Sequence, residues 1–131
     1  MSLVIKSPVL HSLISAGQDA ALQECCGLLL GEGNIITAIQ RAGNIHPAPQ
    51  THFEIDPAVL INAHKAQRSG GPAIVGYYHS HPNGLTAPSE TDAAMAAADG
   101  KVWAIIAGDT VTFWRDEKSG FTALSYTVTE V

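Results

Sequence analysis

The chain has 131 residues, of which 46% are hydrophobic and 15% are charged, and its formal net charge is −5. This composition is that of a globular domain with a hydrophobic core, so we expect residues 1–131 to form a single domain. Lysine and arginine are scattered singly, and no apolar stretch approaches ~18 residues, which argues against nucleic-acid binding and against a membrane span.

The first half of the chain alternates strands with helices. Hydrophobic periodicity and turn residues predict, in order, a strand at 3–6, a helix from Pro8 to about Leu22, and paired strands at 26–31 and 34–40. A loop at 44–50 and a short strand at 52–55 follow, and Asp56 caps a helix that runs to about Arg68.

The second half begins with a strand and a helix and ends in strands. The expected elements are a strand at 73–79, a loop, a helix at 89–98, and three strands at 102–107, 110–115 and 121–128. The predicted fold class is therefore α/β (α+β), with a mixed, largely antiparallel sheet flanked by helices.

Cysteine usage and the N-terminus indicate a compartment. The only cysteines are Cys25 and Cys26, whose adjacency disfavours a disulfide, so we expect both to be reduced. The N-terminus lacks the charged segment and long apolar run of a secretory signal. We therefore expect a cytoplasmic protein.

Residues 79–92, HSHPNGLTAPSETD, join the end of an expected strand to the start of an expected helix. Side chains two residues apart share one face of a strand, so His79 and His81 project together. Two neutral imidazoles on one face suit a shared metal ion, and the loop is long enough to bring Asp92 across the strand end as a third ligand. A catalytic zinc site usually has three protein ligands and a fourth position for water.

Each half of this motif also has a structural explanation. Ser89-Glu-Thr-Asp92 fits a capping box, in which Ser89 accepts from a helix N–H and Asp92 reaches back to the cap. The histidine pair is also explained as an ordinary polar strand end. A metal site is favoured because both features occur together, on either side of a Pro/Gly loop.

The same stretch fits H-x-H-P-x(5)-P-S-x-x-D and resembles the signature of the JAMM (MPN+, Mov34/PAD-1) metalloproteases. Residues 23–31, QECCGLLLG, resemble the element in which that family carries a glutamate before an apolar strand, with Glu24 in its place. The segment 44–56 resembles the family's middle portion. The resemblance extends from about residue 3 to about residue 128 and implies the family's cytidine-deaminase-like architecture.

The resemblance also implies roles for the matching residues. His79, His81 and Asp92 correspond to the ligands of one Zn²⁺ per chain, Glu24 to the general base that activates water, and Ser89 to the residue that stabilises the oxyanion. Zinc lowers the pKa of bound water to about 7, which agrees with such a mechanism. Family members that lack one of these residues are noncatalytic scaffolds, whereas this chain has all five.

The activity implied is that of a zinc-dependent peptidase or isopeptidase. By analogy with the compact single-domain prokaryotic type, the substrate is a ubiquitin-like or sulfur-carrier protein, cut after its C-terminal Gly-Gly. The alternative is a noncatalytic or weakly catalytic zinc-binding interaction module of the same fold. A zinc deaminase is disfavoured because H-x-E and P-C-x-x-C are absent. A mononuclear iron oxygenase would leave Glu24 and Ser89 without a role. The oligomeric state is left open.

The remaining histidines have no ligand-like spacing to the motif. We interpret them as surface residues, although His52 lies in a segment that could line the cleft; they are His11, His46, His52 and His64.

Overall fold

Eight strands form one mixed sheet in the computed structural model, which describes residues 2–130; the predicted domain ends, Met1 and Val131, lie outside these residues. The strands are β1 (Leu3–Lys6), β2 (Cys26–Glu32), β3 (Ile35–Ala42), β4 (Ala73–Ser80), β5 (Val102–Ala107), β6 (Thr110–Glu117), β7 (Gly120–Leu124) and β8 (Tyr126–Thr129). The helices are α1 (Ser7–Ala20), α2 (Pro57–Arg68) and α3 (Glu90–Met95).

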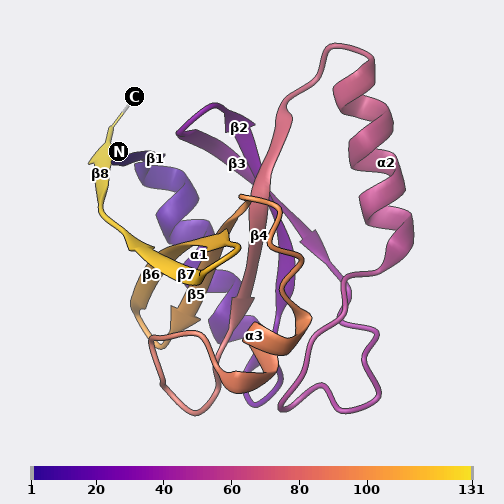
Figure 1. The fold of residues 1–131 in the computed structure, drawn as a ribbon, viewed down its shortest axis with the longest axis vertical. Helices are drawn as coiled ribbons and strands as arrows, with labels where there is room; N and C mark the ends of the chain where they lie inside the picture. Colours follow the sequence, from indigo (N-terminus) through magenta and orange to yellow (C-terminus); the bar gives the residue numbers. More distant parts are fainter. Residues whose placement is uncertain (1, 131) are drawn as a thin grey trace.

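The sheet curls because the strands at its two edges, β7 and β8, follow one another in the chain. Its order is β7-β6-β5-β4-β2-β3-β1-β8, so β7 and β8 lie at opposite edges although only Ser125 separates them (Figure 1). The rings of Phe113 in β6 and Tyr126 in β8 are 4.9 Å apart and close the curl. Antiparallel pairs outnumber the parallel pairs β1–β3, β1–β8 and β4–β5, which confirms the predicted mixed sheet.

The two longer helices pack on different strands. Helix α1 contacts β1, β3, β5 and β6 and buries Val9, Leu13 and Ala16 at helical spacing. A Cβ at Gly17 would lie 2.8 Å from Ile106 Cγ2, so this close approach of α1 to β5 requires glycine. Helix α2 contacts β4 and stands at the side of the molecule (Figure 1). Within residues 2–130, no helix is long and apolar enough to cross a membrane.

Two predicted elements are shorter or absent. The strand expected at 52–55 is wrong, because this segment makes only one isolated bridge, between Asn44 and Ile55. The helix expected at 89–98 ends at Met95. Alanine favours continuation, but the Ala98 N–H donates to the carboxylate of Asp116 at 3.0 Å, and this tertiary bond pulls the chain out of the helix.

A third element is divided. The strand expected at 121–128 breaks at Ser125, where the Leu3 N–H donates to the Ser125 carbonyl. The residues before the break pair with β6 and those after it pair with β1. The alternation of apolar residues cannot indicate that one extended segment changes partner across a closing sheet.

Candidate metal centre

Strand register brings Glu24 beside the histidine pair. Strands β2 and β4 are antiparallel with Cys26 opposite His79. One residue further, the Cys25 N–H donates to the Ser80 hydroxyl at 2.9 Å, and the Ser80 N–H donates to the Cys25 carbonyl at 3.1 Å. Glu24 is therefore level with His81, at the end of β4 where the chain leaves the sheet.

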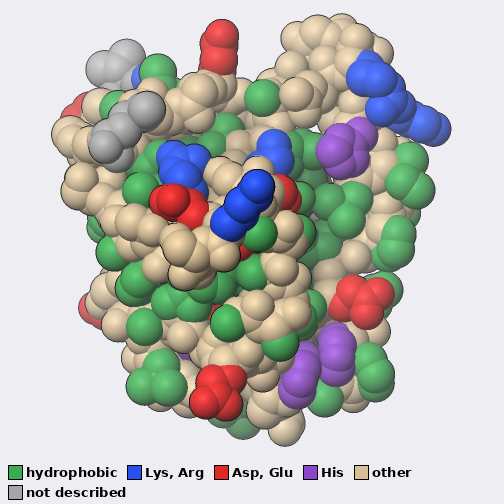
Figure 2. Space-filling model, viewed as in Figure 1, with side chains coloured by type: hydrophobic (Ala, Val, Ile, Leu, Met, Phe, Trp, Pro, Cys, Tyr) green, Lys and Arg blue, Asp and Glu red, His purple; other side chains and the backbone are tan. Residues whose placement is uncertain are grey.

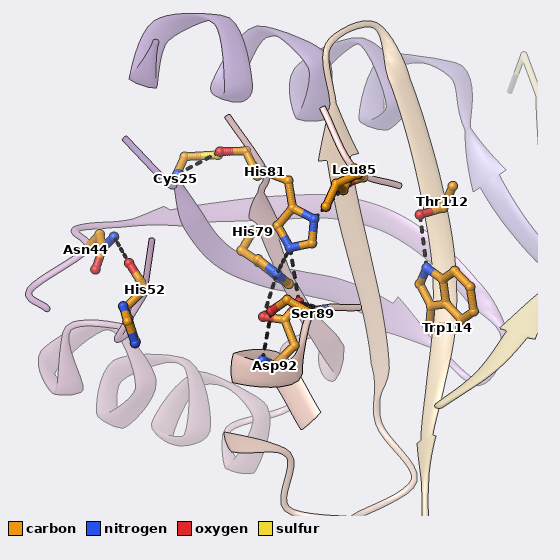
Figure 3. Close-up of polar contacts among 11 residues, drawn as sticks. Cys25, Asn44, His52, His79, His81, Leu85, Ser89, Asp92, Thr112 and Trp114 are labelled. Carbon is orange, nitrogen blue, oxygen red and sulfur yellow. Dashed lines mark hydrogen bonds and ion pairs between the residues drawn. The ribbon is translucent and has the colours of Figure 1, made fainter. Parts of the chain in front are cut away.

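The side chains of His79, His81 and Asp92 converge on one point (Figure 3). Nε2 of His79 is 3.0 Å from Asp92 Oδ1, and Nε2 of His81 is 3.0 Å from Asp92 Oδ2. The two Nε2 atoms are also 3.0 Å apart. All three residues are buried, at 0%, 5% and 2% exposure respectively.

The arrangement fits a metal ion. Nδ1 of His81 faces the Leu85 carbonyl oxygen at 2.8 Å, so a neutral ring carries its proton there and turns the lone pair of Nε2 inward. That lone pair meets a carboxylate oxygen and a second imidazole nitrogen, which repel it unless a metal ion or a proton lies between them. Two bonds of about 2 Å at a tetrahedral angle separate zinc ligands by about 3.3 Å, close to the spacing found here.

The protonation preferences of His79 and Asp92 agree with this interpretation, whereas that of His81 in metal-free protein favours a proton in the place of the metal. Burial lowers the pKa of His79, which favours the neutral ring that binds metals. Burial opposes protonation of His81 as well, but its hydrogen bonds to Asp92 and Leu85 outweigh burial and raise its pKa. Burial acts to raise the pKa of Asp92, and its hydrogen bonds with His79 and His81 reverse this and lower it, so the carboxylate stays ionised.

The capping box is present and shares its carboxylate with the cluster. The Asp92 N–H donates to the Ser89 hydroxyl at 3.0 Å, and the Ser89 N–H donates to Asp92 Oδ2 at 2.9 Å. The capping role of Ser89 and Asp92 is therefore compatible with the contacts that Asp92 makes with the two histidines. Because the Ser89 hydroxyl accepts this bond, its own proton is available to a ligand.

We expect Ser89→Ala to affect stability and turnover separately. Loss of the cap should cost about 1 kcal/mol of unfolding free energy, measured by denaturant unfolding. If the hydroxyl also donates to the reacting oxygen, turnover falls by ~100-fold or more. Ser89→Thr keeps both the acceptor and the donor and should restore both properties. Full activity of Ser89→Ala would exclude the catalytic role.

Glu24 is held by the loop that precedes α2. Its N–H donates to the Pro49 carbonyl at 2.7 Å, and its carbonyl accepts from the side-chain amide of Asn44 at 2.9 Å. Asn44 also donates to the His52 carbonyl and accepts from the N–H groups of His46 and Glu54, which ties the loop into one unit. Glu24 is 7% exposed, and burial raises its pKa to about 7. It is not a member of the converging group.

The raised pKa of Glu24 predicts a pH-dependent cost in metal-free protein. Below pH 4.5, the ordinary pKa of the carboxyl in the unfolded chain, Glu24 is protonated in both the folded and the unfolded protein. As the pH rises from there to about 7, the free energy of unfolding falls, because the unfolded chain ionises Glu24 and the folded chain resists its ionisation. Such a shift corresponds to about 1 to 3 kcal/mol once solvent access is allowed for. In the presence of chelator, the stability of Glu24→Gln minus that of wild type should therefore be larger at pH 8 than at pH 4. An equal difference at both pH values would show that burial of the charge costs nothing.

Aromatic residues form a wall behind His79. Its ring stacks on Phe53 at 4.4 Å and meets Trp103 edge-on at 5.6 Å. Nδ1 of His79 has no hydrogen-bond partner among residues 2–130, so on this side of the ring the imidazole is oriented by packing on these two aromatic rings. Local sequence patterns assign no role to Phe53 or Asn44. The only indication that Phe53 and Asn44 contribute to the site was their position in the segment 44–56, which resembles the middle portion of the JAMM family.

The histidines outside the motif stay away from the cluster. His46 and His52 stack on each other at 4.6 Å in the loop before α2, and neither belongs to the group of metal-competent side chains. Cys25 and Cys26 are both free, as expected.

Comparison with known proteins defines the class. The family model of prokaryotic homologs of the JAB domain matches residues 6–117. The chain therefore belongs to this family. These comparisons confirm the predicted resemblance to JAMM proteins and the predicted fold class. They also confirm the predicted class of enzyme, a JAMM-type metalloprotease.

Three relatives illustrate the similarity. The chain is 35% identical over 97 residues to a desampylase of Haloferax volcanii, covering 72% of this chain and 68% of the relative. It is 38% identical over 72 residues to a probable TtuB-protein conjugate cleaving protease of Thermus thermophilus, covering 55% of this chain and about half, 48%, of that protein. A JAB1/MPN domain protein from Archaeoglobus fulgidus has the same fold, with a TM-score of 0.64, 20% identity, and coverage of 96% and 98% of the two chains.

Proposed function

We propose that the protein is a zinc-dependent isopeptidase or peptidase that cleaves after the C-terminal Gly-Gly of a ubiquitin-like or sulfur-carrier protein. The observation that carries this proposal is the convergence of His79, His81 and Asp92, with Glu24 level with His81. The relatives named as a desampylase and a TtuB-protein conjugate cleaving protease support the substrate class.

Each residue has a defined task in this reaction. His79, His81 and Asp92 would hold one Zn²⁺, which when bound lowers the pKa of water to about 7 and polarises a carbonyl group. Glu24 takes the proton of the attacking water and delivers it to the leaving amine. The Ser89 hydroxyl donates to the oxygen on which negative charge develops. Phe53 and Trp103 keep solvent from the back of His79.

The number of converging ligands argues against the alternative of a noncatalytic zinc module. A purely structural zinc site is closed by four protein ligands, whereas the converging group within residues 2–130 has three. We further propose a cytoplasmic location, which two free cysteines support, and single-domain organisation over residues 1–131.

We expect wild-type protein loaded with zinc to cleave a ubiquitin-like protein joined through its C-terminal Gly-Gly to a lysine side chain. Chelator should abolish cleavage, and Gly→Ala at either position of the substrate should slow it sharply, because an added Cβ hinders close passage of the backbone over the site. The measurement is product formation by gel and mass spectrometry. Equal turnover of unrelated unfolded peptides would indicate a general peptidase instead.

A further inference from the structure

A pocket opens on the other side of the aromatic wall from the metal centre. It has a volume of about 390 Å³, and its walls come from the start of α2, from β4 and from the segment after α3. In Figure 2 hydrophobic side chains lie in the depression between α2 and that segment. The apolar members of its lining include Phe53, Leu60, Tyr77, Met95 and Trp103.

The pocket shares an aromatic wall with the metal centre. Phe53 and Trp103 form its inner wall and are the two rings that pack on His79, at 4.4 and 5.6 Å between ring centroids. Met95 lies one helical turn after Asp92 on α3. A substrate residue a short distance along the chain from the scissile bond can therefore place its side chain here.

The charges at the pocket are all negative. The charged residues that line it are Glu54, Asp99 and Asp116, and no lysine or arginine is among the lining residues. Asp116 is 2% exposed, while Glu54 and Asp99 are exposed at the rim. These charges act on the Tyr77 hydroxyl: its pKa is raised first by burial and then by the carboxylates of Asp99 and Asp116.

An apolar pocket with an acidic rim selects a particular ligand chemistry. Aromatic faces attract cations and also cover aliphatic stems, and carboxylates bind the charged end. A plain apolar side chain such as leucine would bring no positive charge to the carboxylates at the rim, Glu54 and Asp99.

We propose that this pocket is a specificity subsite that binds a long basic side chain, arginine or lysine, from the substrate segment adjoining the scissile bond. This inference rests on the proposed function, because it takes the substrate to be an extended chain that ends at Gly-Gly. With this subsite, the preferred substrate carries a basic residue in its C-terminal segment in addition to the terminal Gly-Gly.

The test measures binding to the zinc-loaded protein without turnover. Six-residue peptides end in Gly-Gly and carry one arginine at the third, fourth, fifth or sixth position from the C-terminus, with alanine elsewhere. Each is matched by a peptide with citrulline, which has arginine's shape without its charge. The chain has two methionines, and the ¹³C-methyl NMR signal of Met95 reports occupancy of the pocket.

We expect the arginine peptide of at least one register to shift the Met95 signal and to bind about 5- to 10-fold more tightly than its citrulline match. The difference should vanish in Glu54→Gln/Asp99→Asn. The Asp99→Asn change keeps a side-chain oxygen that can accept the Lys101 N–H, as Asp99 does at 3.0 Å, so the loop is preserved. The matched control Glu32→Gln/Glu117→Gln removes two charges outside the pocket lining and should keep the difference.

Three results would overturn the inference: equal binding of arginine and citrulline peptides in every register, a difference that survives Glu54→Gln/Asp99→Asn, or no response of Met95. The outcome is separable from that of the proposed function. If wild type cleaves the Gly-Gly conjugate while arginine and citrulline peptides bind equally, only the subsite is wrong. If the conjugate is not cleaved, the proposed function fails whatever the peptides do.

Discussion

Glu24→Gln should lose at least ~100-fold in turnover of a Gly-Gly conjugate while it still binds zinc, because proton transfer by a positioned carboxylate typically contributes ~10²–10⁴-fold. The amide is nearly isosteric, so the loop contacts that hold the residue through its backbone, from Pro49 and Asn44, are retained. The measurement pairs single-turnover kinetics with metal analysis of the same sample.

Glu90→Gln is the matched control for this variant. Glu90 is exposed and begins α3, and it is not a member of the converging group. It should leave zinc content unchanged and turnover close to wild type. Wild-type activity of Glu24→Gln would show that another group moves the proton, and loss of zinc from Glu24→Gln would make Glu24 a ligand rather than a base.

Removal of a proposed ligand should have a different signature, in which metal binding is lost first. His79→Ala and His81→Ala should each weaken zinc binding by more than ~100-fold, beyond the ~10–100-fold cost of losing a hydrogen-bond partner of a ligand. Activity should fall with metal content. His64→Ala, outside the converging group, is the matched control and should keep both. Full zinc occupancy of the His79→Ala/His81→Ala double variant would refute the assignment.

The histidine pair and its carboxylate could be predicted from local rules alone. The period of two along β4 places His79 and His81 on one face, and the structure brings their Nε2 atoms within 3.0 Å of each other. The capping box predicted at Ser89 and Asp92 is also present. Local reasoning could not decide between cap and metal cluster, and the structure shows that one carboxylate takes part in both contacts.

Glu24 was found only through family resemblance, for a physical reason. Its place opposite His81 depends on the register of β2 against β4, two strands that lie far apart in the chain. Alternation of residues predicts strands but does not select their partners. The same limit explains the divided strand at Ser125 and the early end of α3, where the carboxylate of Asp116 accepts the Ala98 N–H from a distant strand. Phe53 and Asn44 escaped notice because each acts through tertiary contacts.

One titration tests the central claim, that His79, His81 and Asp92 form the metal site of a Gly-Gly-specific isopeptidase. Metal-free protein receives Zn²⁺ in small steps, and binding is followed by calorimetry while the rate of conjugate cleavage is measured on the same samples. The account predicts no cleavage without metal, a rate that rises in proportion to bound zinc, and a plateau at one equivalent per chain. Cleavage by metal-free protein, or one bound equivalent of zinc with no cleavage of the conjugate, would contradict it.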